Sequence, residues 1–157
     1  MLERSIAFVV VLVAMLALTA DYAVAQPLPE KVISRKDADA IFSMTRSQWE
    51  DHAKQLTHPL GWPMRLMSIE TGTGFVAVDP KTGVRVTLQP LFKTPTDPPE
   101  MIVVGSWYPA GQTPITPDFV ARVQRAAQED LGAGYTVTAN SGAASGLEGI
   151  ELLVRRK

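Results

Sequence analysis

The sequence predicts an α+β fold, in which an antiparallel sheet of about five to six strands has helices packed on one face and follows a cleaved N-terminal signal peptide. Two observations predict the folded part. Apolar residues recur at helical spacing over residues 34–56 and 117–131, whereas they alternate with a period of two over most other segments. Because the predicted strands are grouped and the helices stand apart, the pattern favours α+β over alternating strands and helices.

The first 25 residues have the order of a secretory signal peptide. A charged start that contains Arg4 precedes an apolar run over residues 6–20, and the small residues Ala23 and Ala25 stand just before Gln26. We therefore expect cleavage between Ala25 and Gln26 and a periplasmic or secreted protein. The alternative is an uncleaved anchor, but as a helix this run reaches only about 22 Å, short of the roughly 30 Å of a bilayer core.

The remaining chain is expected to comprise an extended leader, residues 26–33, and a single α+β domain, residues 34–157. Pro27 and Pro29 favour extended backbone in the leader. Residues 26–157 carry 14 basic and 14 acidic side chains, and a neutral chain has no general attraction for nucleic acid or for an anionic membrane. The sequence has no cysteine, which excludes disulfides, thiolate metal sites and thiol nucleophiles.

Residues 34–56 are predicted to be helical. Ser34 and Asp37 form a capping pair at the start of this segment. A second capping pair, Ser47 and Glu50, lies in its middle, so the segment forms either one helix or two short ones. The apolar stripe expected to face the sheet consists of Ala38, Ile41, Phe42, Trp49, Ala53 and Leu56.

The next segments are predicted to form a three-stranded antiparallel meander. Residues 64–69 and 75–78 are the first two strands, joined by a glycine-containing turn at 71–74. Residues 79–83 combine Asp, Pro and Gly in the manner of a hairpin loop. Residues 84–89 alternate apolar and polar side chains, which is typical of a half-exposed strand.

A central strand and a well-capped helix follow. Residues 90–100 contain four prolines and are predicted as a loop. Residues 101–108 are apolar on both faces, as in a strand with neighbours on both sides. After a second loop at 109–116, Thr116 is a good N-cap for a helix over residues 117–131, whose first residue is proline.

The last two strands are predicted at residues 135–139 and 150–154, on either side of a flexible Gly/Ser/Ala loop at 140–146. If all the strands form a simple up-and-down meander, alternate loops lie at the same end of the sheet. We therefore expect this loop, the 79–83 turn and the 109–116 loop to lie together.

Few residues point to catalysis. His52 and His58 are the two histidines, and neither has a metal-ligating side chain three or four residues away. The sequence also lacks a Gly-x-Ser-x-Gly nucleophile elbow and a phosphate-binding glycine loop. We predict no catalytic residue, metal or cofactor, although a small exported hydrolase that uses His52 or His58 with a distant carboxylate is an alternative.

Three aromatic residues near the loop end are the candidate ligand-binding residues. Trp62 precedes the first strand, and Trp107 and Tyr108 end the fourth. Flat aromatic surface beside small polar loops is suited to stacking a sugar or a peptide, or to anchoring a protein. Trp49, by contrast, lies on the apolar helical stripe and is expected in the core.

The sequence therefore predicts a non-enzymatic binding or protein-interaction module that is exported to the periplasm. Its partner is expected to be a small ligand or another envelope protein, with no nucleic acid and no membrane span after signal cleavage. A membrane-anchored accessory subunit that retains its signal is a further alternative.

Overall fold

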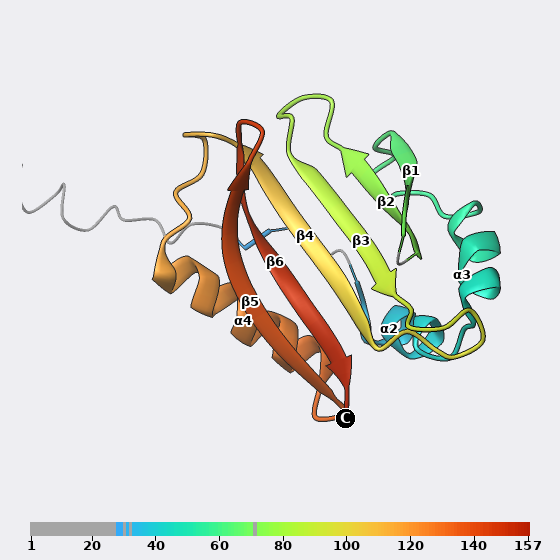
Figure 1. Ribbon diagram of the computed structural model, residues 1–157. Helices are drawn as coiled ribbons and strands as arrows, with labels where there is room; N and C mark the ends of the chain where they lie inside the picture. Colours follow the sequence, from blue (N-terminus) through green and yellow to red (C-terminus); the bar gives the residue numbers. More distant parts are fainter. Residues whose placement is uncertain (1–27, 30, 32, 71) are drawn as a thin grey trace, which may run out of the picture.

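The computed structural model describes residues 28–29, 31, 33–70 and 72–157. The predicted signal peptide, residues 1–25, lies outside the described residues. The described elements, shown in Figure 1, are α2 (Arg35–Ile41), α3 (Arg46–Ala53), β1 (Met64–Ile69), β2 (Gly72–Val78), β3 (Arg85–Leu91), β4 (Met101–Pro109), α4 (Pro117–Leu131), β5 (Tyr135–Ala144) and β6 (Leu147–Arg156).

The strands form one six-stranded antiparallel sheet in the order β1-β2-β3-β4-β6-β5. This architecture confirms the predicted antiparallel sheet with separate helices. The simple meander holds from β1 to β4 but is wrong beyond it, because α4 carries the chain past one strand position and β6 then fills the gap between β4 and β5. The edges of the sheet are β1 and β5.

The first helical segment divides into α2 and α3. Ser34 and Asp37 form the predicted capping box at the start of α2. At the start of α3, the Thr45 hydroxyl accepts a hydrogen bond from the Gln48 amide, and the Gln48 side chain accepts one from the Thr45 amide. The second capping pair is thus Thr45 with Gln48, and the proposed pair of Ser47 with Glu50 is wrong. Thr45 is extended, with φ −72° and ψ 166°, and this conformation separates the two helices.

Helix α4 has the predicted bounds because both of its ends are encoded locally. The Thr116 hydroxyl accepts a hydrogen bond from the Phe119 amide, 3.2 Å away, and Pro117 occupies the first helical position. Gly132 follows the last turn with φ +82°, a conformation that favours glycine.

Most strands are longer than the sequence pattern predicts. The predicted turn at 71–74 is too long, because β2 begins at Gly72 and pairs from there with β1. The predicted loop at 90–100 starts too early, because Pro90 lies within β3 and pairs with Ile102 of β4. Its missing amide costs no ladder bond to β2, since the β2–β3 register ends at the pair Phe75 and Leu88.

The predicted loop at 140–146 is likewise too long. Strand β5 continues to Ala144, and the turn contains only Ser145 and Gly146, with φ values of 52° and 75°. Two successive positive φ angles match the right-handed twist of a tight hairpin.

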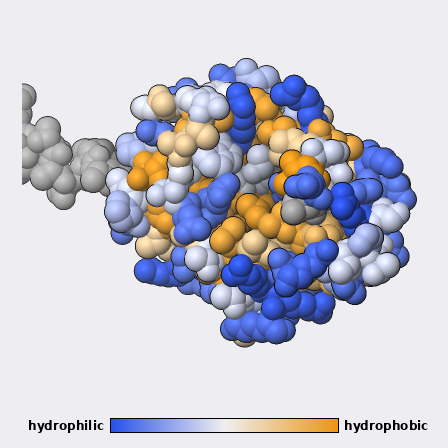
Figure 2. Space-filling model, in the orientation of Figure 1, coloured by the Kyte–Doolittle hydropathy of each residue, from blue (hydrophilic) through white to orange (hydrophobic). Residues whose placement is uncertain are grey.

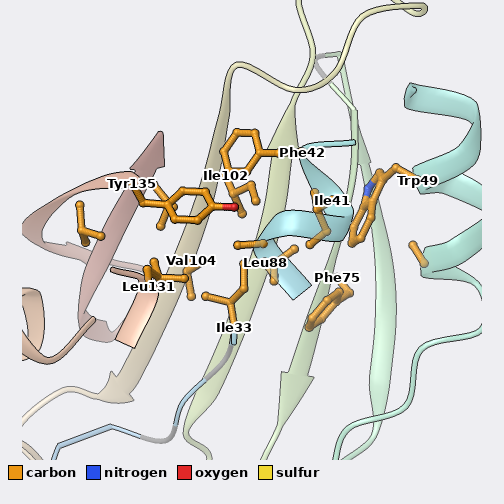
Figure 3. Packing of buried hydrophobic residues seen from close by; sticks show 14 of the residues in the cluster. Ile33, Ile41, Phe42, Trp49, Phe75, Leu88, Ile102, Val104, Leu131 and Tyr135 are labelled. Atoms are coloured by element: carbon orange, nitrogen blue, oxygen red, sulfur yellow. The ribbon is translucent and has the colours of Figure 1, made fainter. Parts of the chain in front are cut away.

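All the described helices pack on one face of the sheet, which we call the helical face (Figure 1). Ile41 of α2, the following residue Phe42 and Trp49 of α3 lie over the sheet, as Figure 3 shows. The indole of Trp49 is buried, and its Nε1 donates a hydrogen bond to the Thr73 carbonyl. Ile41, Phe42 and Trp49 belong to the main hydrophobic core. This core also includes Ile33, Ala38, Ala53, Phe75, Leu88, Phe92, Ile102, Val104, Leu131, Tyr135, Val137 and Val154.

The opposite face, which we call the open face, carries no described helix. Successive residues of a strand point to opposite faces, so Val103 and Trp107 of β4 lie on the open face while Ile102 and Val104 are buried on the helical face. Figure 2 views the molecule from this side and shows hydrophobic side chains gathered over the middle of the sheet.

Candidate functional site

The loop end of the sheet brings together residues that are far apart in the chain. Trp62, which precedes β1, and Tyr108, near the end of β4, both line a cavity of about 450 Å³ on the helical face. The 79–83 turn and the 109–116 loop contribute the rest of the rim through Asp79, Thr82 and Gln112. The expected gathering of loops at one end therefore occurs, because β2, β3 and β4 keep the meander order.

Hydrogen bonds hold the rim of this cavity in place. Both carboxylate oxygens of Asp79 are used: one accepts from the Lys81 amide at 2.9 Å and the other from the Thr82 hydroxyl at 2.6 Å. These two hydrogen bonds lower the pKa of Asp79 below its usual value, and the bond from the Thr82 hydroxyl has the larger effect. Gln112 Nε2 donates to the Thr82 carbonyl at 3.4 Å, which ties the two loops together.

Two hydroxyl groups on β4 line the cavity without a protein partner among the described residues. Ser106 and Tyr108 are two residues apart and so share the helical face, where they are 7% and 9% exposed. Burial raises the pKa of the Tyr108 hydroxyl, which keeps it a neutral donor and acceptor. Both hydroxyls are therefore available to donate to and accept from a polar ligand in the cavity.

His58 positions the Trp62 indole. The two rings are stacked, with centroids 4.4 Å apart and planes 6° from parallel. The Leu60 amide donates to Nδ1 of His58 at 3.2 Å, which fixes the imidazole in the turn before β1. One face of the indole is thus covered by His58.

Trp107 does not join Trp62 and Tyr108. It lies on the open face, where it lines a different cavity of about 450 Å³ with Arg65 and Arg85. Its indole lies over glycines of the adjacent strands: a Cβ atom at Gly149 would be 2.7 Å from Trp107 Cε3. Sequence adjacency of Trp107 and Tyr108 therefore places them on opposite faces, as the pleat requires.

Both histidines line a third cavity, of about 520 Å³, between α2, α3 and the sheet. His52 lies near Trp49, with ring centroids 6.0 Å apart. Within the described ranges, no group of three or more His, Cys, Asp and Glu side chains is placed to hold a metal ion. The hydrolase alternative stays a prediction.

Among the described helices, none combines the length and apolar composition needed to cross a membrane. Five polar residues of the cavity were not among the predicted site residues, namely Asp79, Thr82, Ser106, Gln112 and Thr113. Ser106 had a detectable signal, because it is the one serine in the otherwise apolar and aromatic central strand.

Comparison of the chain with protein-family models, with curated proteins and with solved structures finds no match.

Proposed function

We propose that the protein is an exported, non-enzymatic binding module whose loop-end cavity takes a carbohydrate. The observation that carries this proposal is the convergence of an indole and two unpartnered hydroxyls, from Trp62, Ser106 and Tyr108, on one cavity. Its volume of about 450 Å³ falls within the roughly 300–1,000 Å³ of small-molecule sites.

The chemistry of the lining supports a sugar over a purely apolar ligand. A sugar ring has an apolar face that stacks on an aromatic ring and hydroxyls that both donate and accept hydrogen bonds. Trp62 provides the ring, while Ser106 and Tyr108 provide groups that donate and accept. Gln112 and Thr82 add an amide and a hydroxyl at the rim.

Export is supported by the sequence alone. The apolar run at 6–20 and the small residues Ala23 and Ala25 favour a signal peptide cleaved before Gln26, and the lack of cysteine leaves the fold independent of disulfide formation. An exported sugar-binding module would meet cell-envelope or environmental glycans. The anchored accessory subunit is the alternative if the signal is retained.

The test is a thermal-shift and calorimetric titration of the protein purified after export, with N-acetylglucosamine oligomers and soluble cell-wall fragments as probes. A ligand at one hundred times its Kd stabilises the fold by about 2.7 kcal/mol. We expect Trp62→Ala to abolish this shift and Ser106→Ala to reduce it.

Trp107→Ala is the matched control, because Trp107 is also a half-buried tryptophan but lies on the open face of the sheet. It should lower the melting temperature of the free protein while the ligand-induced shift persists. Absence of binding to every glycan probe, or equal loss of binding in both tryptophan variants, would contradict the proposal.

A further inference from the structure

We infer that two copies of this chain pack through their open faces, with a two-fold axis that runs parallel to β4 and lies between the two sheets. The inference is independent of the proposed sugar site, which lies on the helical face. It rests on the apolar character of the open face, the placement of its charges and the shape of the surface beside Trp107.

The open face is more apolar than a solvated sheet face requires. Antiparallel sheets with one solvated face alternate apolar and polar side chains. Here β2 presents Val76 and Val78, β4 presents Val103 and Trp107, and β6 presents Leu153 on the open side, all half-buried. Figure 2 shows this apolar area in the middle of the view with hydrophilic side chains around it.

The size of the face fits a protein interface. Six strands spaced about 4.8 Å apart and about 23 Å long present a flat area of roughly 650 Å². Standard interfaces bury about 800 Å² of accessible surface on each partner. The apolar side chains occupy part of this area, beside the charged and polar side chains of Arg85, Thr87 and Glu151.

One pair of opposite charges on the open face, Arg85 and Glu151, is arranged in a self-complementary way. Arg85 lies on β3 and Glu151 on β6, on either side of the central strand β4. Neither side chain makes an ion pair or hydrogen bond with another described residue. Their backbone partners on β4, Trp107 and Gly105, are two residues apart, so the two charged residues are offset by about 7 Å along the strands.

A two-fold rotation about an axis along β4 superposes the β3 side of one copy on the β6 side of the other. Arg85 of each copy then faces Glu151 of its partner, and the contact forms twice. Sheets packed face to face are about 10 Å apart, a separation that arginine and glutamate side chains bridge.

The shape of the open face around Trp107 is also compatible with this two-fold axis. The Trp107 indole leans from β4 over the β6 and β5 glycines Gly149 and Gly142. A cavity of about 450 Å³ extends from Trp107, Ala144 and Leu147 to Arg65, Val76 and Arg85 on the other side of β4. The same rotation places the raised Trp107 of each copy over the cavity of the other.

Sedimentation velocity of the exported, full folded protein over a range of concentrations tests this inference. We expect a concentration-dependent dimer that weakens at high ionic strength. Arg85→Glu and Glu151→Arg should each raise the dimer dissociation constant by at least about tenfold, since each leaves a like-charge contact at the interface. The double variant Arg85→Glu/Glu151→Arg should restore dissociation to within about threefold of the parent.

Arg125→Glu on the exposed side of α4 is the matched control, because it makes the same charge change away from the open face and should leave the dissociation constant unchanged. Both test positions are partly or fully exposed, and circular dichroism verifies that the variants fold. A monomer at every concentration, or a double variant that dissociates more readily than either single variant, would overturn the inference.

Discussion

Trp107 and Tyr108 are neighbours in the sequence but serve opposite faces of the sheet. The sequence identified both as aromatic residues at a strand end. Because successive side chains of a strand point to opposite faces, these two neighbours cannot line the same cavity. Trp62 and Tyr108 were correctly expected at one end of the sheet, while the polar residues that complete their cavity come from a turn and a loop whose hydrogen bonds are visible only in three dimensions.

Two glycines beneath the Trp107 indole differ in the space that an added methyl group would have, and this difference gives a prediction about stability. A Cβ at Gly149 would lie 2.4 Å from the Ser106 carbonyl oxygen, which belongs to the backbone of a central strand and has little room to move. Gly149→Ala should therefore lower the free energy of unfolding by about 1–3 kcal/mol in urea melts.

Gly142→Ala is the control, since a Cβ there meets Trp107 no closer than 3.6 Å. It should leave stability unchanged or slightly higher. Equal midpoints for the two variants would show that the indole is not packed against Gly149 as described.

Tyr135 gives a pH-dependent prediction. Burial raises its pKa to about 12, and the hydrogen bond that its hydroxyl donates to Asp39 adds to the rise. Because the phenol of an unfolded chain titrates near pH 10, the unfolded state loses this proton first, and stability that is complete below pH 10 is lost as the pH rises towards 12.

We expect the free energy of unfolding to fall by about 2 kcal/mol more between pH 9 and pH 11.5 in the parent than in Tyr135→Phe. Urea melts of both proteins at the two pH values measure the difference. Identical pH slopes would mean that the Tyr135 phenol is not the linked group.

At the level of elements, α4 stabilises the half of the sheet formed by β5 and β6. Phe119 and Val123 pack with Ile150 of β6, and Gln128 Nε2 donates to the Gly132 and Tyr135 carbonyls at 3.0 Å each. Val123 is 5% exposed, and a carboxylate at this position would be buried without a partner.

Val123→Asp should therefore lower the free energy of unfolding by about 3–5 kcal/mol. Ala121→Asp places the same charge at an exposed position of α4 and should change stability by less than about 0.5 kcal/mol. Chemical denaturation of the two variants makes the comparison. A Val123→Asp midpoint equal to that of Ala121→Asp would contradict the packing of α4.

Helices and strands whose ends are set by neighbouring residues in the sequence were predictable. Segments that are extended only because another strand pairs with them were not. The capping residues Ser34 and Thr116 fixed the starts of α2 and α4 because capping bonds span three residues. The extension of β5 to Ala144 was not predictable, since small residues such as Gly142 and Ala143 have no strand preference of their own. They are extended because β6 pairs with them.

At the scale of the whole molecule, the sequence predicted the antiparallel sheet and its separate helices but not the position of β6. A hairpin fixes which strands pair with each other, and it leaves open which side of that hairpin meets the rest of the sheet. Ile150 and Leu152 of β6 pack with the apolar residues of α4 and also lie in the strand that pairs with β4. These contacts favour the strand order in which β6, rather than β5, lies next to β4.

The proposed export makes a prediction about the whole chain. Expressed in full in a bacterium with a general secretion pathway, the protein should accumulate in the periplasm with Gln26 as its first residue. Intact-mass measurement of the periplasmic and membrane fractions tests this. A membrane-bound product that retains residues 1–25 would favour the anchored accessory subunit instead.

The insertion of β6 between β4 and β5 affects the order in which the sheet can form during folding. Strands β1 to β4 precede β6 in the chain, and β4 has a bare edge until β6 pairs with it. The pair of Ile102 with Val154 closes this edge across a long separation in sequence, and contacts of that kind form slowly. A chain of this topology therefore completes its native sheet only when β6 has paired with β4.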